Sequence, residues 1–324
     1  MKKFLIIGAV VFLAGALLFT GAMAAADWDF SALSTVPKYE VKTFTADNNG
    51  LDITIDNSNT PVRLGTSEDG KVHLEYYDNT KQYYVINESD KLTVERVDTY
   101  KWYERFFQFD LQKPKLTLLL PENYAGNIYI INDNGNFTID GLSTSGTLYH
   151  RTSNGSITLK NFRSASVEVK TSNGNITVSD CQIETTLKAT TSNGNYVISD
   201  SSVGNMITLK TSNGDATVTN LTAAELFDIK TSNGSIRLTE LACNDITVKT
   251  SNGNITLGGV DGDSVYLKTS NGNIRGSIEG SMSDYNIISH TSNGNNNLPT
   301  DTSGNPRKLE VRTSNGDIKI SFSK

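Results

Sequence analysis

The tetrapeptide Thr-Ser-Asn-Gly occurs nine times in this chain of 324 residues, and this repetition limits the possible folds more than any other feature. A degenerate copy, Asn-Asp-Asn-Gly, precedes the nine and contains Asn134. The asparagines of the nine copies are Asn154, Asn173, Asn193, Asn213, Asn233, Asn252, Asn271, Asn293 and Asn315. Successive asparagines lie 19 to 22 residues apart. A period near twenty is typical of a solenoid or of an array of identical strands.

Each repeat has the alternating pattern of two short β-strands. In the unit Ser-Val-Glu-Val-Lys-Thr-Ser-Asn-Gly-Asn-Ile-Thr-Val-Ser, Val167 and Val169 point to one face and Glu168 and Lys170 to the other. The apolar alternation resumes after the glycine, at Ile176. We therefore expect two strands around a Ser-Asn-Gly corner, followed by a variable loop.

Two folds fit this unit. If Asn-Gly is a two-residue hairpin turn, the chain is an antiparallel meander. If it is a bend, each unit is one coil of a parallel β-solenoid, in which like residues stack on like. The six prolines all lie outside residues 122–298, as expected where strands are paired on both edges. The pattern favours an all-β, right-handed parallel β-solenoid with about 19–22 residues per coil.

The N-terminus predicts a membrane segment. Lys2 and Lys3 precede an uncharged, mostly apolar run over residues 4–26, long enough to span a bilayer as a helix. An uncleaved anchor is favoured, and a signal peptide cleaved near Ala24 is the alternative. In either case the residues after Asp27 are exported, which places the protein at the cell membrane or, after cleavage, outside the cell.

The chain divides into four parts on this basis. We expect an anchor or signal over residues 1–26, a tether over 27–43, an irregular β-rich cap with early coils over 44–124, and the repeat solenoid over 125–324.

Composition excludes several kinds of site. The net charge of −6 gives no overall nucleic-acid-binding character. Cys181 and Cys243 are about three repeats apart, on the order of 14 Å in a stack of coils, so two buried free thiols are expected in place of a disulfide. The histidines are not at ligand spacing from a cysteine or from each other, so no metal or other cofactor is expected.

The repeated corner has a structural and a functional interpretation. In the favoured one, glycine supplies a positive φ, stacked asparagines satisfy corner amides and threonine caps the strand. In the other, ladders of threonine and asparagine form a flat face that binds ice, sugar or a cation. Neutral asparagine replaces the carboxylates that a calcium-binding repeat requires.

The residue before each corner is basic in seven of the nine copies. These candidate residues for an anionic-polymer strip are Arg151, Lys170, Lys210, Lys230, Lys249, Lys268 and Arg312. Stacked coils would bring like charges to roughly 5 Å from each other along one outer face. The strip is interpreted either as a solvated ladder that prevents aggregation or as a weak binding site for an anionic polymer of the cell envelope.

An aromatic segment lies between the membrane segment and the repeats. Its candidate residues are Tyr100, Trp102, Tyr103, Phe106 and Phe107. The favoured interpretation is a hydrophobic plug over the open end of the solenoid, which a repeat array requires. The alternative is a site for a partner protein or for the membrane surface.

The Thr-Ser-Asn-Gly-Asn-Ile-Thr-Val units resemble a bacterial family called domain of unknown function 4097. The resemblance includes the segment Lys-Trp-Tyr from Lys101, the segment Pro-Lys-Leu-Thr-Leu-Leu-Leu-Pro from Pro114, and the lead-in Gly-Ala-Met-Ala-Ala from Gly21. Members are labelled as candidate adhesins or β-strand-repeat proteins. The resemblance implies a right-handed β-helix-like fold and a surface or envelope-stress context, and it implies no catalytic residues.

Catalysis is not expected, since acidic residues are scattered and no nucleophile, metal or phosphate motif is present in the sequence. The sequence therefore predicts a surface-exposed, adhesin-like solenoid that acts as a non-catalytic binding or scaffold module. One alternative is an envelope-stress sensor that contacts a membrane protein. A third is a carbohydrate-active β-helix enzyme.

Overall fold

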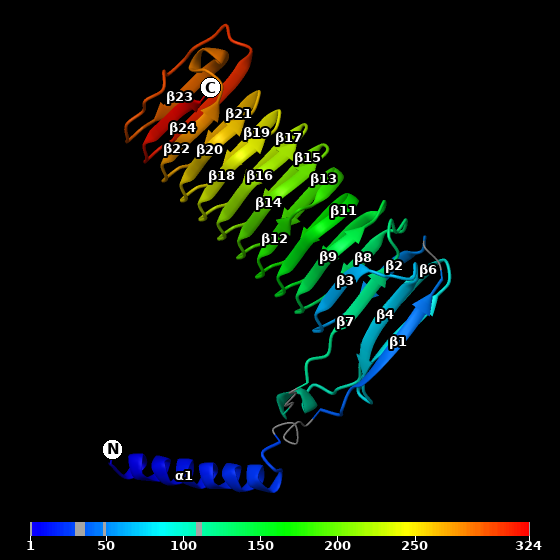
Figure 1. The fold of residues 1–324 in the computed structure, drawn as a ribbon. Helices are drawn as coiled ribbons and strands as arrows, with labels where there is room; N and C mark the ends of the chain where they lie inside the picture. The colour runs from blue at the N-terminus through cyan, green and yellow to red at the C-terminus, as the bar shows by residue number, and fades with distance from the viewer. Residues whose placement is uncertain (1, 30–35, 48–49, 108–111, 324) are drawn as a thin grey trace.

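The structure is a computed structural model, and it describes residues 2–29, 36–47, 50–107 and 112–323. The chain is mostly β-structure, and its strands stack along one axis into an elongated β-solenoid (Figure 1). The apolar helix α1 (Lys2–Ala25) lies beyond the N-terminal end of the stack (Figure 1). Two short 3-10 helices, η2 (Glu104–Phe107) and η3 (Met282–Asp284), interrupt the strands.

The strands form two rows on different faces of the coil. In order of pairing, the first strand row contains β5 (Gln82–Glu88), β6 (Lys91–Asp98), β2 (Asp52–Asp56), β8 (Ile128–Ile131), β10 (Thr147–Arg151), the end of β11 (Ile157–Lys170), β13 (Gln182–Thr190), β15 (Met206–Lys210), β17 (Leu226–Lys230), β19 (Asp245–Lys249), β21 (Ser264–Lys268), β24 (Arg307–Thr313) and β23 (Tyr285–Thr291). The second strand row contains β1 (Glu40–Ala46), β4 (Val72–Asp78), β7 (Leu116–Leu120), β3 (Val62–Thr66), β9 (Phe137–Ser143), the start of β11, β12 (Ile176–Ser179), β14 (Tyr196–Val203), β16 (Ala216–Ala223), β18 (Ile236–Ala242), β20 (Ile255–Asp261), β22 (Ile274–Glu279) and β25 (Ile318–Ser323).

Pairing within the repeats is parallel. Strand β15 pairs in register with β13 and β17, and β16 pairs in register with β14 and β18. The antiparallel pairs are β1–β4, β4–β7 and β5–β6, all at the N-terminal end. The parallel solenoid is therefore confirmed, and the antiparallel meander is wrong.

A coil has a third, short face that the sequence did not reveal. After β15, the corner at 211–214 leads into the first half of β16, and Asn220 then turns the chain with a φ of 49°. The last residues of β16, Leu221 to Ala223, pair with the coils on either side before β17 begins. The expected variable loop is thus partly β-structure.

The corner glycines have a different role from the one expected. None of them has a positive φ among the described residues. Instead, a Cβ atom on Gly214 would lie 1.7 Å from the carbonyl oxygen of Gly194 in the preceding coil. Glycine is required because the backbones of stacked corners approach too closely for any side chain. Left-handed backbone occurs at a second corner, at Gly141, Asn161, Asp180, Asp200, Asn220, Glu240 and Gly259.

The asparagine side chains form the expected ladder, but they bond one another. The corner amides are satisfied instead by the threonine hydroxyl and by backbone carbonyls, such as that of Ser192, which accepts from the Asn213 N–H. The Nδ2 of Asn213 donates to Oδ1 of Asn193 at 2.7 Å, and the equivalent bond recurs along the stack. At the N-terminal end Asn134 donates to Asn59, a ladder member that the motif does not identify. The buried Thr211 accepts from the Gly214 N–H at 3.2 Å and donates to the Gly194 carbonyl at 3.2 Å. The threonine and asparagine side chains of the corners are therefore occupied by bonds within the stack.

The interior is a set of apolar columns. Val167, Val169 and Ile176 are fully buried, as the alternation predicted. Cys181 and Cys243 are buried free thiols, which confirms that prediction, and burial raises the pKa of each to about 11. Neither thiol is a reactive nucleophile near neutral pH for this reason.

The C-terminal coils do not stack in chain order. Strand β24 pairs with β21 on one side and with β23 on the other. The asparagine ladder follows the same order, because Asn315 donates to Asn271 and Asn293 donates to Asn315. The last coil of the sequence is thus inserted beneath the one before it.

Candidate functional site

The basic residues that precede the corners lie in one column on the first strand row, interrupted at one coil. Arg151 pairs in register with Lys170, Lys210 with Lys230, and Lys249 with Lys268. Lys230 and Lys249 join these pairs, and Lys268 is followed by Arg312. Thr190 interrupts the column between Lys170 and Lys210. The structure therefore brings together the seven residues of the basic strip, with His290 outermost, beside Arg312.

Three members of the basic strip have side-chain partners, two on their own strand and one, Lys249, on the neighbouring strand β21. Lys230 Nζ lies 2.7 Å from Asp228 Oδ2, and Arg312 forms an ion pair with Glu310. Lys249 Nζ lies 4.8 Å from the centre of the Tyr266 ring, a cation–π contact. The strip is locally screened by these groups but not neutralised along its length.

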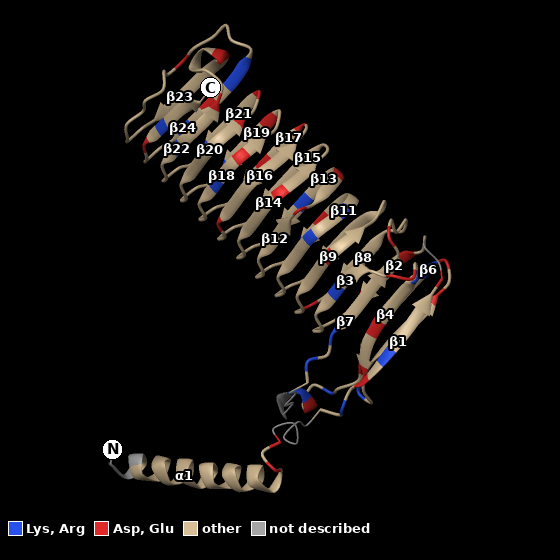
Figure 2. Cartoon of the chain, in the orientation of Figure 1, with Lys and Arg blue, Asp and Glu red and all other residues tan. Residues whose placement is uncertain are grey.

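The other members have no ion pair within the described part of the chain. These residues are Arg151, Lys170, Lys210 and Lys268, and all four are exposed. Stacked strands lie about 4.8 Å apart, so each of them is adjacent to another cation in the column. Figure 2 shows basic and acidic residues interspersed over the stacked strands, so the strip is a local feature of a negatively charged molecule.

Two residues of the aromatic segment, Trp102 and Tyr103, do not cover the end of the solenoid, whereas Tyr100 is half-buried. The Trp102 side chain is 74% exposed and that of Tyr103 is 49% exposed. Their rings form an edge-to-face pair with centres 6.0 Å apart, and Lys101 Nζ lies 5.8 Å from the centre of the Tyr103 ring. The plug interpretation is wrong for these two residues. The side chains of Phe106 and Phe107 lie outside the described structure.

The antiparallel strands occupy the N-terminal end of the stack instead. Tyr84 of β5 is buried there, and its hydroxyl donates to Asn57 Oδ1 at 2.8 Å. The Tyr76 ring packs edge-on against it, with centres 5.6 Å apart. The helix η2, which follows Trp102 and Tyr103, lies between this end and α1 (Figure 1).

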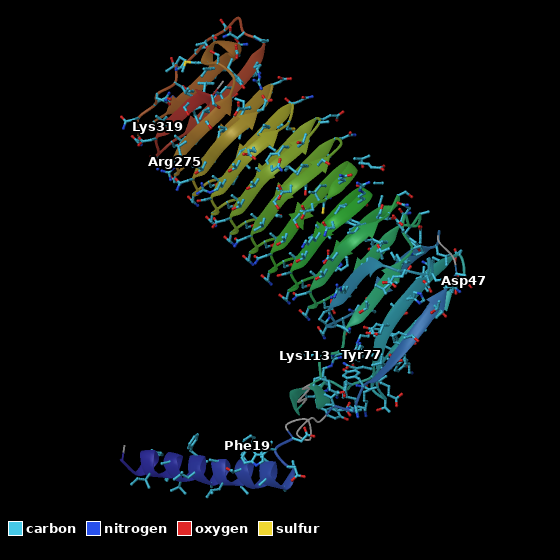
Figure 3. All side chains as sticks on the ribbon, in the orientation of Figure 1. Phe19, Asp47, Tyr77, Lys113, Arg275 and Lys319 are labelled. Carbon is cyan, nitrogen blue, oxygen red and sulfur yellow. The ribbon has the colours of Figure 1, made fainter. Side chains whose placement is uncertain are left out.

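Helix α1 is long and apolar enough over Ile6–Ala25 to cross a membrane. Its side chains are largely exposed, among them that of Phe19 (Figure 3). A signal sequence near an N-terminus can also satisfy this criterion of length and composition. The helix is therefore either a membrane anchor or a signal.

His150 is a titratable group inside the solenoid core. Its side chain is fully buried and stacks on Phe137 with ring centres 4.1 Å apart. Neither ring nitrogen makes a hydrogen bond of normal geometry. Burial lowers the pKa of the imidazole to about 3, so the ring is neutral in the folded protein near pH 7. Its position inside the core excludes His150 from any surface site.

The buried imidazole makes stability depend on pH. Below the ordinary histidine pKa the unfolded chain binds a proton that the folded chain does not, so stability falls as pH decreases from about 6.5 towards 3. Between pH 6.5 and 5 this group removes about 2 kcal/mol of stability. We expect His150→Leu to abolish this loss of stability at low pH. The substitution should also raise the free energy of unfolding at pH 7 by about 1 to 3 kcal/mol, because it removes a buried polar ring without hydrogen-bond partners. Urea denaturation of the wild type and of His150→Leu from pH 7 to 5 measures how the free energy of unfolding of each depends on pH. Parallel pH dependences of the two proteins would contradict the prediction.

No group of three His, Cys, Asp or Glu side chains that could hold a metal occurs among the described residues. The structure places the candidate residues on two separate surfaces, the basic strip along the solenoid and the aromatic segment near α1.

The family comparison agrees with the repeat pattern. The family model described as Toastrack DUF4097 matches residues 51–239 and 222–324. No protein with a curated description matches the sequence. Among solved structures, a candidate cell adhesion protein from Clostridium sporogenes is 12% identical, with a TM-score of 0.27, over 89% of this chain and 100% of its own. A candidate adhesin from Bacteroides fragilis is 13% identical, with a TM-score of 0.29, over 87% of this chain and 97% of its own.

With TM-scores below 0.5, neither structure bears on the function of this chain. The family model, in contrast, covers most of the sequence, including every Thr-Ser-Asn-Gly corner. The chain belongs to the Toastrack DUF4097 family.

Proposed function

We propose that this protein is a membrane-anchored, right-handed β-solenoid that binds an anionic polymer of the cell envelope through its basic strip. Helix α1 would hold the chain at the outer face of the membrane, and the solenoid would extend the strip away from it. Binding requires no reaction at a single point, so the module is non-catalytic.

The observation that carries the proposal is the unbroken register of cations from Lys210 to Arg312 in the first strand row. Cations stacked about 4.8 Å apart repel one another, and the repulsion is relieved when a linear polyanion lies along them. A polymer with regularly spaced charges can contact successive coils at once. The contact is electrostatic and exposed, so it should weaken as salt is added.

The corner residues do not compete for this role. Their threonine and asparagine side chains are already hydrogen-bonded between coils. Because these side chains are already hydrogen-bonded, the structural interpretation of the corner is favoured over a binding face for ice, sugar or a cation.

The proposal predicts loss of polymer retention when the central charges are removed. The variant Lys210→Gln, Lys230→Gln, Lys249→Gln and Lys268→Gln should elute from immobilised linear polyphosphate and poly-L-glutamate at clearly lower salt than the wild type. The reason is the loss of four adjacent cations from one face. The salt concentration at elution is the measurement.

A matched control removes the same number of positive charges from the second strand row. Arg63, Arg237, Arg275 and Lys319 are exposed on the second strand row, and Arg275 and Lys319 are neighbours there (Figure 3). Replacing these four residues with Gln should leave retention close to the wild type. Equal losses in the two variants would show that only net charge matters, and unchanged retention of the first variant would contradict the proposal.

A second candidate function is contact with a membrane protein in an envelope-stress sensor. The exposed Trp102 and Tyr103 favour it, because large aromatic side chains at a surface near a membrane segment are typical of partner or interface sites. Trp102→Ala should then abolish that contact in a cross-linking experiment and leave retention on polyphosphate unchanged.

A further inference from the structure

The third face of the coils is hollowed into a groove that runs along the solenoid axis. A cavity of about 560 Å³ extends from Asn123 to Ala224, and two adjoining cavities of about 370 Å³ each share part of its lining. Gln182 lines all three cavities. The groove is therefore one continuous depression over several coils, on the third face, which is formed by the ends of second-row strands such as β14 and β16 and by the start of β13.

One polar column lines this groove. Ser143 pairs in register with Arg163, Arg163 with Gln182, Gln182 with Ser202, and Ser202 with Thr222. Each coil thus contributes one polar side chain about 4.8 Å from the next. We call these five residues the groove column.

The groove column differs from the corners in having free hydrogen-bonding capacity. Within the described part of the chain, the side chains of Arg163, Gln182, Ser202 and Thr222 make no hydrogen bond or ion pair, whereas Ser143 donates to Asn123 Oδ1 at 3.2 Å. The corner threonines, in contrast, both donate and accept within the stack. Guanidinium, amide and hydroxyl groups together offer both donors and acceptors to a ligand.

The floor of the groove is apolar. Ile183 and Val203 are almost fully buried and present only their edges there, Gly204 adds no side chain, and the exposed methyl group of Ala224 extends the apolar lining. Binding sites usually combine such apolar lining with a few placed polar groups. A ligand that fits must therefore have apolar faces and hydrogen-bonding edges, and must be extended along the axis.

The surroundings exclude two other ligand classes. Glu184 and Asp180 on the walls repel a polyanion, so the groove is unsuited to the polymer proposed for the basic strip. A peptide strand cannot add to the backbone here, because the segments at Arg163 and Ser202 are already paired with coils on both sides. A sugar ring, with C–H faces and hydroxyl edges, matches the floor and the groove column.

We propose that this groove binds an uncharged linear oligosaccharide, aligned with the solenoid axis and hydrogen-bonded by Arg163, Gln182, Ser202 and Thr222. Successive rings would meet successive coils. The site does not depend on the basic strip, since its ligand has no charge.

Calorimetric titration of the full chain in detergent with cellohexaose, chitohexaose and maltohexaose tests the proposal. At least one of the three should bind saturably, with an affinity that does not change with salt. The variant Arg163→Ala with Gln182→Ala should bind it at least about tenfold more weakly, because two of the four side chains that hydrogen-bond the ligand are lost. Ser202→Trp, which fills the groove, should abolish binding.

Two controls separate this site from the rest of the molecule. Arg237→Ala with Thr256→Ala removes a matching pair from the second strand row and should leave oligosaccharide binding unchanged. The four-lysine strip variant should also bind the oligosaccharide normally, so failure of one proposal does not imply failure of the other. The absence of saturable binding to all three probes, or wild-type affinity in the Arg163 and Gln182 variant, would overturn the inference.

Discussion

Gly214→Ala is expected to destabilise the solenoid by about 3 kcal/mol or more. The added methyl group would lie 1.7 Å from the Gly194 carbonyl oxygen and 2.5 Å from the carbonyl carbon. Both atoms belong to the backbone of the neighbouring coil, which cannot move aside without breaking the parallel pairing of the adjacent strands. Overpacking against a rigid core costs 1 to 3 kcal/mol or more, and backbone contacts are at the upper end. Urea denaturation of the full chain in detergent measures the change.

Gly258→Ala is the matched control. A Cβ atom at this position in β20 would lie 3.5 Å from the Thr239 side chain, an ordinary contact, and the backbone does not have a positive φ. This variant should be within about 1 kcal/mol of the wild type, or slightly more stable because alanine restricts the unfolded chain. If both glycine variants lost the same stability, close approach would not explain the corner glycine.

Phe227→Ala is expected to cost about 3 to 5 kcal/mol. The Phe227 side chain is fully buried and stacks in one column between Ile207 and Ile246. Its removal leaves a cavity in the middle of the solenoid, where each coil contacts only its neighbours. Hydrogen exchange should show the loss first as increased exchange in β15, β17 and β19, and urea denaturation should show the lower overall stability.

The neighbouring exposed position provides the comparison for Phe227. Met206 lies beside Ile207 in β15 and is 36% exposed, so Met206→Ala should change stability by less than about 0.5 kcal/mol. Hydrogen exchange that is raised equally along the whole stack by Phe227→Ala would contradict the local cooperation of stacked coils.

The sequence was sufficient to predict the coils and their interior. Repetition at a nearly constant spacing identifies residues that occupy equivalent positions, and alternation then separates inward from outward side chains, as at Val167 and Glu168. The asparagine ladder and the basic strip follow from the same argument, because any column is defined once the period is known.

Features that depend on three-dimensional distance were not predictable. A glycine in the motif is equally compatible with a positive φ and with a close approach of two backbones. Only the distance between stacked corners distinguishes these two explanations. The positive φ occurs instead at residues such as Asp200 and Asn220. Asx residues that recur with the repeat period, and that tolerate left-handed backbone, are the signal that could have located this second corner.

The order of the last coils and the groove were also inaccessible to sequence reasoning. Insertion of β24 between β21 and β23 depends on how the long loop before Arg307 folds back. The groove column changes residue type at every coil, from Arg163 to Gln182 to Ser202, so it has no motif. The groove column can be recognised only once the third face of the coils is known.

The function proposed for this protein depends on the basic strip as the surface that binds an anionic polymer. Lysine footprinting of the full chain by mass spectrometry, with and without linear polyphosphate, tests it most directly. Lys170, Lys210 and Lys268 should become protected from acylation, whereas Lys160 and Lys319, exposed on the second strand row, should react at unchanged rates. Equal protection of all five lysines, or protection confined to Lys160 and Lys319, would contradict the claim.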